Sequence, residues 1–284
     1  MKYTFIKNHE YLFPIEKMCQ VLEVGSSGYF KWKNKPISNR TLRKNEIKQQ
    51  ITSIYFTSKQ RYGSPRITIE LNALGYRISR ITVAKYMKEL GLRSKLSKKF
   101  KVTTDSKHNY LVVENVLDRG FAVDHPSKVW VSDITYIQTK EVFLYFTTII
   151  DLYDRKMIGW SLSNGMNTEE TTLAAWKMAT RNRSVQKGLI FHSDRGVQYA
   201  NKKFANTIES YEVIRSMSRK GNCWDNAVAE SFFKSLKTEL IYGNKLITKQ
   251  QMELEIFEYI EIWYNKKRRH SALNYLNSTN KCNF

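Results

Sequence analysis

A near-continuous run of apolar and β-branched residues at 128–137, KVWVSDITYI, constrains the fold of this chain more than any other feature. Such a run, bounded by turn residues, is typical of a buried β-strand. Two similar runs follow closely, at 142–153 and 156–163, and only short polar segments separate them. The pattern therefore predicts three consecutive strands joined by short turns.

Helical and strand-like segments alternate after the third predicted strand. Helices are expected at about 168–182 and 201–210, and each is followed by a short strand, at 188–192 and 213–217. Three adjacent strands followed by alternating helices and strands indicate a mixed α/β sheet. Two further helices are expected downstream, at 223–240 and about 248–265.

The first ninety residues are patterned as helices rather than strands. Residues 14–33 read as two short helices, and a longer one is expected from about 43 to 57. Gly75 then ends one helix, and another runs from a cap at Ser79 towards Gly91. Two helices joined by a glycine-containing turn are the pattern of a helix-turn-helix, and an ordinary helical bundle is the alternative.

The last helix of this region has a predicted buried stripe and a basic outer face. Arg80, Lys85 and Lys88 lie on the outer face, where they can contact DNA. The predicted buried stripe contains Ile81, Val83, Ala84, Met87 and Leu90.

Positive charge is concentrated in the first part of the chain. The net charge is +21, and residues 1–110 hold 23 Lys and Arg against 7 Asp and Glu, whereas residues 111–284 hold 24 against 19. Such asymmetry indicates a polyanionic partner, most often nucleic acid, with a ribosomal-type or membrane-surface protein as the alternative. Residues 94–125 begin with a basic, non-periodic stretch and are expected to form a linker that follows a DNA backbone.

The remaining composition favours a globular protein of the reducing cytoplasm. No apolar run approaches the roughly 20 residues that span a bilayer, and the start of the chain lacks the pattern of a secretory signal. The three cysteines are far apart and form no C-x-x-C spacing, which argues against a zinc site and a disulfide framework. We therefore expect a cytoplasmic protein without membrane contacts.

Two aspartates occupy positions where a carboxylate needs an explanation. Asp133 lies inside the first predicted strand, where an ionised carboxylate must be paired, neutralised or bound to a metal. Asp194 directly follows the short strand at 188–192, at a strand end that presents side chains to a crevice. The alternative for Asp194 is the cap of a turn before Gly196.

The helix predicted at 223–240 brings a third carboxylate. Asn226, Glu230, Lys234 and Lys237 fall on one side of it, at spacings of four, four and three. A plain Glu230–Lys234 surface pair is the alternative interpretation. Three converging carboxylates would bind two hard divalent cations, which serve phosphoryl chemistry. The opposite, apolar side of the helix comprises Val228, Ala229, Phe232, Phe233, Leu236 and Leu240.

Four sequence motifs resemble those of a known family, the DDE transposases of bacterial insertion sequences of the OrfB type. They are W-x-x-D-I-T-Y-I at 130–137, H-S-D-R-G-V-Q-Y at 192–199, D-N-A-V-A-E-S-F-F-K-S-L-K-T-E at 225–239 and Y-N-x-x-R-R-H-S-A-L at 264–273. The 35 residues between Asp194 and Glu230 match the spacing that this family shares with retroviral integrases. The segment at 61–92 resembles the helix-turn-helix module that precedes such a core.

The resemblance implies a ribonuclease H-like, retroviral-integrase-like catalytic core with Asp133, Asp194 and Glu230 as catalytic residues and metal ligands. It implies a Mg²⁺- or Mn²⁺-dependent transposase with a two-metal site, which nicks DNA at element ends and joins the freed 3′-OH to another phosphodiester. The family's basic residue after the glutamate matches Lys237. The alternatives are a non-catalytic DNA-binding regulator and a nuclease or resolvase of the same fold.

The resemblance also implies a domain layout and partners. The chain is expected to bind terminal-repeat and target DNA as a homodimer or higher oligomer, and an upstream-frame protein is a further expected partner. The expected segments are a small helical DNA-binding segment at 1–40, a helix-turn-helix module at 41–93, the linker at 94–125, the catalytic core at 126–245 and a C-terminal helix with a basic tail at 246–284.

Further residues receive individual interpretations. His192 is interpreted as a structural strand-end histidine or as a second-shell group near the metals. Trp224 is expected to anchor the start of its helix by packing, and Asp151 and Asp154 are expected to form a turn. The expected DNA-contacting residues are Lys234, Lys237, Arg219, Lys220, Asn226, Arg80, Lys85, Lys88, Arg268 and Arg269.

Overall fold

The computed structural model describes residues 1–36, 38–94, 112–242 and 245–281. The chain divides into two compact units. Unit 1 comprises Met1–Lys59 and Gly63–Arg93, and unit 2 comprises Gln60–Tyr62 and Ser94–Phe284. Among the described residues, no helix is long and apolar enough to cross a membrane.

Unit 1 is entirely helical in its described residues. The two short helices predicted within 14–33 are present, but the first helix of the chain was not predicted because it has neither a side-chain cap nor a clear apolar stripe. Its Ile6 is nevertheless fully buried against the next two helices. The helices of unit 1 are α1 (Lys2–His9), α2 (Ile15–Val21), α3 (Ser26–Lys33), α4 (Asn39–Thr57), α5 (Ser64–Ala73) and α6 (Arg80–Glu89).

Helices α5 and α6 form the predicted pair joined through Gly75, which has a φ of +90° that favours glycine. The Ser79 side chain caps α6 by accepting a hydrogen bond from the Thr82 N–H, at 3.2 Å. The predicted buried stripe is wrong in part, because Ile81 is 83% exposed and Ala84 is exposed as well. The face of α6 that packs inward is set by the buried pair Val83 and Met87, which stand one helical turn apart. The basic residues Arg80, Lys85 and Lys88 are exposed, as predicted.

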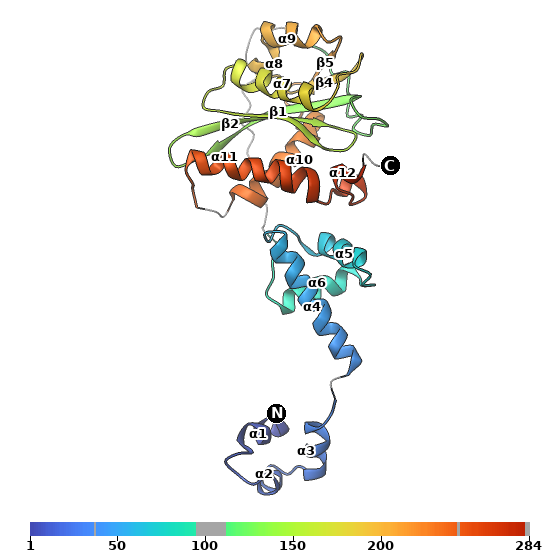
Figure 1. The fold of residues 1–284 in the computed structure, drawn as a ribbon, viewed down its shortest axis with the longest axis vertical. Coiled ribbons are helices and arrows are strands. Elements are labelled where there is room, and N and C mark those ends of the chain that lie inside the picture. Colours follow the sequence, from blue (N-terminus) through green and yellow to red (C-terminus); the bar gives the residue numbers. More distant parts are fainter. Residues whose placement is uncertain (37, 95–111, 243–244, 282–284) are drawn as a thin grey trace. The chain divides into compact units, whose positions relative to one another are not determined.

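Unit 2 is built on a five-stranded sheet with the strand order β3-β2-β1-β4-β5 (Figure 1). β1 pairs with β2, and β2 with β3, in antiparallel fashion, whereas β4 lies parallel to both β1 and β5. The predicted mixed α/β sheet is therefore confirmed. Its strands are β1 (Val129–Gln138), β2 (Phe143–Asp151), β3 (Met157–Ser163), β4 (Ile190–Ser193) and β5 (Ile214–Met217).

Helices cover both faces of this sheet, with α7, α8 and α9 on one face and α10 and α11 on the other (Figure 1). On the first face, Trp130 of β1 packs against Trp176 of α7, and both are almost fully buried. On the second face, Phe146 of β2 packs against Phe232 and Phe233 of α10. The helical elements of unit 2 are η1 (Glu169–Leu173), α7 (Ala174–Asn182), α8 (Val197–Ala200), α9 (Lys202–Glu209), η2 (Cys223–Asn226), α10 (Ala227–Leu236), η3 (Lys237–Ile241), α11 (Lys249–Phe257), η4 (Glu258–Lys267), η5 (Ser271–Leu273) and α12 (Ser278–Lys281).

The segment expected to be a basic linker differs from that expectation where it is described. Residues 95–111 of the expected linker lie outside the described residues, as do residues 282–284 of the expected tail. The backbone N–H groups of Val116 and Leu117 both donate to the Ser216 hydroxyl of β5, at 2.9 and 3.1 Å. This part of the segment is therefore attached to the edge of the sheet, because its apolar residues and amides find partners there.

Gly159 in β3 allows helix α7 to pack directly on the sheet. A Cβ atom at position 159 would overlap the Ala175 carbonyl oxygen and would lie 2.7 Å from the Ala179 Cβ. We expect Gly159→Ala to lower the free energy of unfolding by about 1–3 kcal/mol, since overpacking forces the helix away from the sheet.

Thermal unfolding of the purified protein measures this effect, and Gly165→Ala is the matched control. A Cβ at Gly165 meets its nearest neighbour, a Glu170 carboxylate oxygen, at an ordinary 3.7 Å. Equal melting temperatures for the two variants would contradict the close helix–sheet contact.

Candidate active site

Parallel pairing of β1 and β4 brings Asp133 and Asp194 to the same level of the sheet. Val131 of β1 pairs with His192 of β4. Asp133 and Asp194 each follow two residues after these paired positions. Side chains two residues apart in a strand share a face, and parallel strands advance in the same direction. The two carboxylates therefore emerge from adjacent positions where β4 ends.

The turn after β4 holds the Asp194 carboxylate through its backbone. The Gly196 N–H donates to Asp194 Oδ1 at 2.9 Å. A Cβ at position 196 would lie 3.0 Å from the same oxygen, so a glycine allows this close approach. The turn-cap interpretation of Asp194 is therefore correct.

Helix α10 carries Glu230 and begins next to β1. The Asn226 side chain donates from Nδ2 to the Ser132 carbonyl oxygen, at 3.0 Å, and so fastens the helix start beside Asp133. The apolar side of α10 is buried as predicted, whereas Glu230 is half-buried. Glu230 makes no hydrogen bond or ion pair within the described part of the chain.

The pKa of Asp133 is raised, and the other two carboxylates contribute to the increase. Burial and the negative charge of Asp194 raise it well above its ordinary value, and Glu230 adds to the increase. The Ile134 N–H, which donates to Asp133 Oδ1 at 2.8 Å, and the charge of Lys237 act in the opposite direction. Burial also raises the pKa of Glu230. Negative charge therefore accumulates at this place, where a cation would relieve it.

Lys237 and Tyr199 are two further titratable side chains near the carboxylates. Lys237 opens the π-helical segment η3, and burial lowers its pKa while the charge of Asp133 raises it. Its ammonium stands 5.3 Å from the centre of the Tyr136 ring. Tyr199 is buried below the site, and its hydroxyl lies 2.7 Å from the Ser132 hydroxyl. Burial and the charges of Asp133 and Asp194 raise the pKa of the Tyr199 phenol.

The carboxylates do not form a closed coordination shell with the side chains as they stand. Within the described residues, no three His, Cys, Asp or Glu side chains are close enough together to hold one metal ion. Asp194 and Glu230 are nevertheless near enough to Asp133 to raise its pKa.

Three residues expected at the site or on DNA have other roles in the structure. Asn226 is buried, and its amide is committed to β1, so it is not free to hold phosphate. Arg268 is also buried, where its guanidinium pairs with Glu239 at 2.9 Å, so its expected DNA contact is wrong. His192 is buried between the hydroxyls of Ser216 and Ser218, at 2.9 and 3.1 Å, rather than hydrogen-bonded to a carboxylate.

The other predicted DNA-contacting residues of unit 2 are more accessible. Lys220 and Lys234 are exposed, and Arg269 is half-buried with its guanidinium 3.3 Å from the Tyr275 carbonyl oxygen. Arg219 is about half exposed, yet it also forms a two-pronged ion pair with Asp225.

Asp225 is a central residue that the sequence analysis missed. It is fully buried and accepts hydrogen bonds from Arg219, Arg119 and the Asn115 amide. These donors hold the pKa of its carboxyl far below the ordinary range, led by Arg219. The D-N-A motif containing Asp225 signalled importance, but its arginine partners are distant in sequence. Asp225 thereby ties the segment around residue 119 to the start of helix α10.

Asp151 and Asp154 form the expected turn and, in addition, a buried ion-pair cluster. Each accepts a backbone N–H two residues further on, from Tyr153 and Lys156 respectively. Both also pair with Arg183, at 2.6 and 2.7 Å. Because a guanidinium already neutralises them, they are poor candidates for metal ligands.

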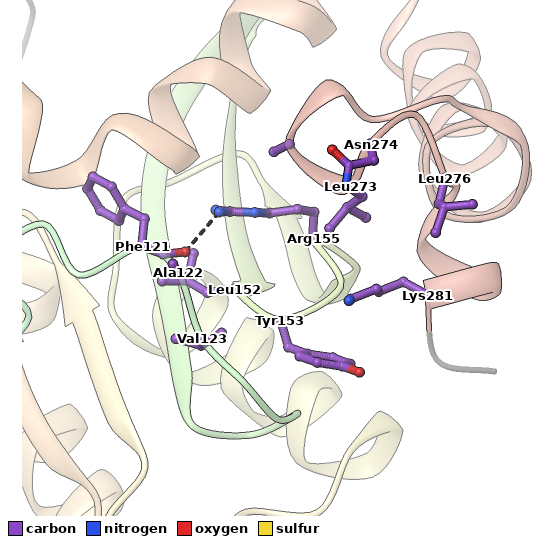
Figure 2. Close-up of a pocket in the computed structure, with 11 residues that line it drawn as sticks. Phe121, Ala122, Val123, Leu152, Tyr153, Arg155, Leu273, Asn274, Leu276 and Lys281 are labelled. Atoms are coloured by element: carbon purple, nitrogen blue, oxygen red, sulfur yellow. Dashed lines mark hydrogen bonds between the residues drawn. The ribbon is translucent and has the colours of Figure 1, made fainter. Parts of the chain in front are cut away.

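A cavity of about 420 Å³ lies away from the three carboxylates (Figure 2). It is lined by the turn after β2, including Tyr153 and Arg155, and by C-terminal residues such as Asn274 and Lys281. Arg155 donates from Nη2 to the Phe121 carbonyl oxygen at 2.9 Å across this cavity (Figure 2). None of the candidate catalytic residues contributes to its wall.

The chain matches known protein families over most of its length. Residues 123–223 and 230–280 match models described as integrase core domain, and residues 42–100 match an HTH-like domain. Transposase InsF for insertion sequence IS3A from Escherichia coli K12 is 41% identical over 273 residues, which cover 95% of this chain and 94% of that protein. The chain belongs to the transposase family of IS3-type insertion sequences.

Other relatives agree with this membership. The insertion element IS600 uncharacterized 31 kDa protein from Shigella sonnei is 40% identical over 256 residues, covering 90% of this chain and 94% of that protein. The family supports the transposase interpretation of the sequence over a non-catalytic regulator or a resolvase. The protein is thus a transposase with an integrase-type core, which is a polynucleotidyl transferase.

Solved structures with a similar fold are more distant. The HTLV-2 integrase catalytic core domain in complex with magnesium has 14% sequence identity and a TM-score of 0.41, covering 55% of this chain and 95% of that one. The catalytic domain of Mos1 mariner transposase has 12% identity and a TM-score of 0.41, covering 48% and 71%.

The Glu239–Arg268 pair generates a prediction about the stability of the core. Glu239 also accepts hydrogen bonds from Tyr259 and Trp263, both at 3.0 Å, so its carboxylate is buried among donors. We expect Arg268→Met to lower the free energy of unfolding by about 3–5 kcal/mol, because it leaves this buried charge without its cation.

Chemical denaturation measures the loss, with Lys266→Met as an exposed control on the same helix. The double variant Glu239→Gln/Arg268→Met is expected to lose less stability than Arg268→Met alone. If the single variant, the double variant and the control all unfold at the same denaturant concentration, the ion pair does not contribute this much to stability.

Proposed function

We propose that Asp133, Asp194 and Glu230 bind two divalent cations, Mg²⁺ or Mn²⁺, and that this transposase uses them to nick DNA and transfer the strand. The observation that supports this assignment is the raised pKa of Asp133, caused by burial and by the charges of the other two carboxylates. The three residues come from a strand, a strand end and a helix. Accumulated negative charge of this kind is typical of cation sites.

The donor set of the candidate site suits hard cations. All three side chains offer carboxylate oxygens, which are the ligands that Mg²⁺ and Mn²⁺ prefer. Within the described residues, the Asp133 side chain accepts one hydrogen bond, at Oδ1, and the Glu230 side chain accepts none. Side-chain oxygens are therefore available, and DNA phosphate and water complete the shell in this proposal.

The reaction consists of two in-line displacements at phosphorus. When bound, two cations activate the attacking oxygen and stabilise the leaving oxygen. In nicking, water attacks the phosphodiester and the 3′ oxygen leaves as a 3′-OH. In joining, that 3′-OH attacks a second phosphodiester, whose own 3′ oxygen leaves. Asn226 and Ser132 keep the catalytic helix against β1 during both steps, and Lys237 offers its ammonium to a phosphate oxygen.

DNA contacts are proposed for the accessible basic residues of both units. In unit 2, Lys237 lies close enough to Asp133 to lower the pKa of its carboxyl, and Lys220, Lys234 and Arg219 are exposed. In unit 1 the proposed contacts follow the exposed side of α6, the second helix of the predicted helix-turn-helix. We propose contacts from Lys220, Lys234, Lys237, Arg219, Arg269, Arg80, Lys85 and Lys88.

The partners and the segment layout complete the proposal. Transposition requires two element ends to be held together, so we propose at least a homodimer on DNA, in the cytoplasm at the nucleoid. The roles of 1–40 as a small helical DNA-binding segment and of 41–93 as a helix-turn-helix module belong to the same proposal. An upstream-frame partner stays a prediction.

Replacing Glu230 tests the assignment. We expect Glu230→Gln to reduce nicking by more than the 10–100-fold that is typical of losing an outer-shell partner, since it removes a charged ligand. Binding of DNA is expected to persist, because the basic residues are unchanged. Gel analysis of a labelled element end measures nicking, and a gel-shift assay measures binding.

The matched control is Glu212→Gln, an exposed carboxylate just before β5 and at the opposite end of the parallel strands from Asp194. It is expected to nick at the normal rate. Normal nicking by Glu230→Gln would remove this residue from the mechanism.

A further inference from the structure

Trp224 exposes a large apolar side chain to solvent, where a tryptophan is not expected. Its side chain is 70% exposed, and it is the most exposed of the six tryptophans, all of which lie in described parts of the chain. Its indole makes no hydrogen bond and no ring contact within those parts, so the expected packing role at the helix start is wrong. A tryptophan normally buries this large apolar surface, and one left open at a functional site marks a place for a partner.

The turn that carries Trp224 is fixed directly after the indole-bearing residue. The next residue, Asp225, is buried and held by Arg219 and Arg119, at 2.8 and 3.0 Å. The residue after that, Asn226, is bonded to the Ser132 carbonyl oxygen of β1. Because these two following residues are tied to the core, the backbone after Trp224 is held in place while its indole lies in solvent.

The position of this turn places the indole at the rim of the carboxylate site. Ser132, to which the turn is bonded, immediately precedes Asp133. Helix α10 with Glu230 begins directly after the turn. A strand whose phosphate lies at the carboxylates therefore passes within a nucleotide or two of the indole.

The charge around Trp224 favours nucleic acid over protein as its partner. Arg119 and Arg219 are about half exposed, and Lys220 is exposed as well. An aromatic face among arginine and lysine side chains is the arrangement that stacks on a base while cations hold the backbone. A base inside an intact duplex has both faces covered, so the stacked base must be unpaired or displaced from its neighbours.

We propose that Trp224 stacks on an unstacked base of a nucleotide that flanks the phosphodiester being cut or joined. The inference rests on the proposed function, because it takes the carboxylates as the place where that phosphate lies. The indole would hold the strand in register with the carboxylates. Stacking of this kind is sequence-tolerant, so Trp224 positions the strand and is not itself a catalytic residue.

The test uses the full-length protein and pre-cut element-end DNA with Mg²⁺. The fluorescent base 2-aminopurine is placed in turn at each of the two nucleotides on either side of the free 3′-OH. We expect quenching by the wild-type protein at one of these positions, retained in part by Trp224→Phe and lost in Trp224→Ala. Leu254→Ala, which removes a side chain with 67% exposure from α11, is expected to quench normally.

A binding cycle distinguishes stacking from a structural effect. At the quenched position, Trp224→Ala is expected to weaken DNA binding by about 5- to 150-fold, the range that corresponds to one stacked base. DNA with an abasic site at that position should bind the wild type with a similar loss, and the two changes together should add little. Independent, fully additive losses would overturn the proposal.

Three further outcomes separate this proposal from its alternatives. A change in oligomeric mass on Trp224→Ala, without any change in quenching, would assign the indole to a second copy of the chain and overturn base stacking. If quenching follows Trp224 but Glu230→Gln nicks normally, stacking stands and the proposed metal ligand fails. If Glu230→Gln stops nicking and no position is quenched, the metal proposal stands and the stacking proposal fails.

Discussion

The parallel pairing of β1 with β4 is the constraint on which the rest of the site depends. It fixes Asp133 and Asp194 at one level of the sheet, although 60 residues separate them in the sequence. The antiparallel strands β2 and β3 extend the sheet on the other side of β1, so β1 becomes a central strand supported on both edges. A central strand gives little freedom to the side chain at Asp133. The geometry of the site is thus a consequence of strand order.

The buried and half-buried carboxylates of this protein include two groups, whose pKa values shift in opposite directions. Asp225 and Glu239 are surrounded by arginines and other donors, and the pKa of Asp225 is held far below its ordinary range. Burial raises the pKa of Asp133, and the charges of Asp194 and Glu230 add to the increase. The first group fastens segments together, because opposite charges gain from burial only when they meet. The second group carries unfavourable repulsion, which the fold tolerates at a place where a cation is expected.

Asp225 and Glu239 hold helix α10 in place through ion pairs before its start and after its end. Asp225 connects the turn before α10 to Arg119 and Arg219, and Glu239 connects the segment after α10 to Arg268. The helix that bears Glu230 is therefore anchored at its start and shortly after its end. Such anchoring fixes the backbone that carries Glu230 relative to β1.

Local patterns in the sequence predicted much of this architecture. The five strands and most helices follow from apolar periodicity, and Asp133 stood out because an aspartate inside an apolar strand is unusual. The wheel for residues 223–240 assumed one continuous α-helix, whereas Asn226 lies in a 3₁₀ turn and Lys237 opens a π-helical segment.

Long-range pairing could not be predicted in the same way. Arg268 and Arg219 look like surface cations until their buried partners are known, because composition gives charge but not burial. The exposure of Trp224 had no local signal either, since apolar residues are expected to pack inward.

Crystals soaked in Mn²⁺ and measured at the manganese absorption edge test the central claim most directly. The account predicts two anomalous peaks about 3.5–4 Å apart, bounded by the carboxylates of Asp133, Asp194 and Glu230. A single pair of peaks at other carboxylates, such as Asp151 and Asp154, with none between these three side chains, would contradict it.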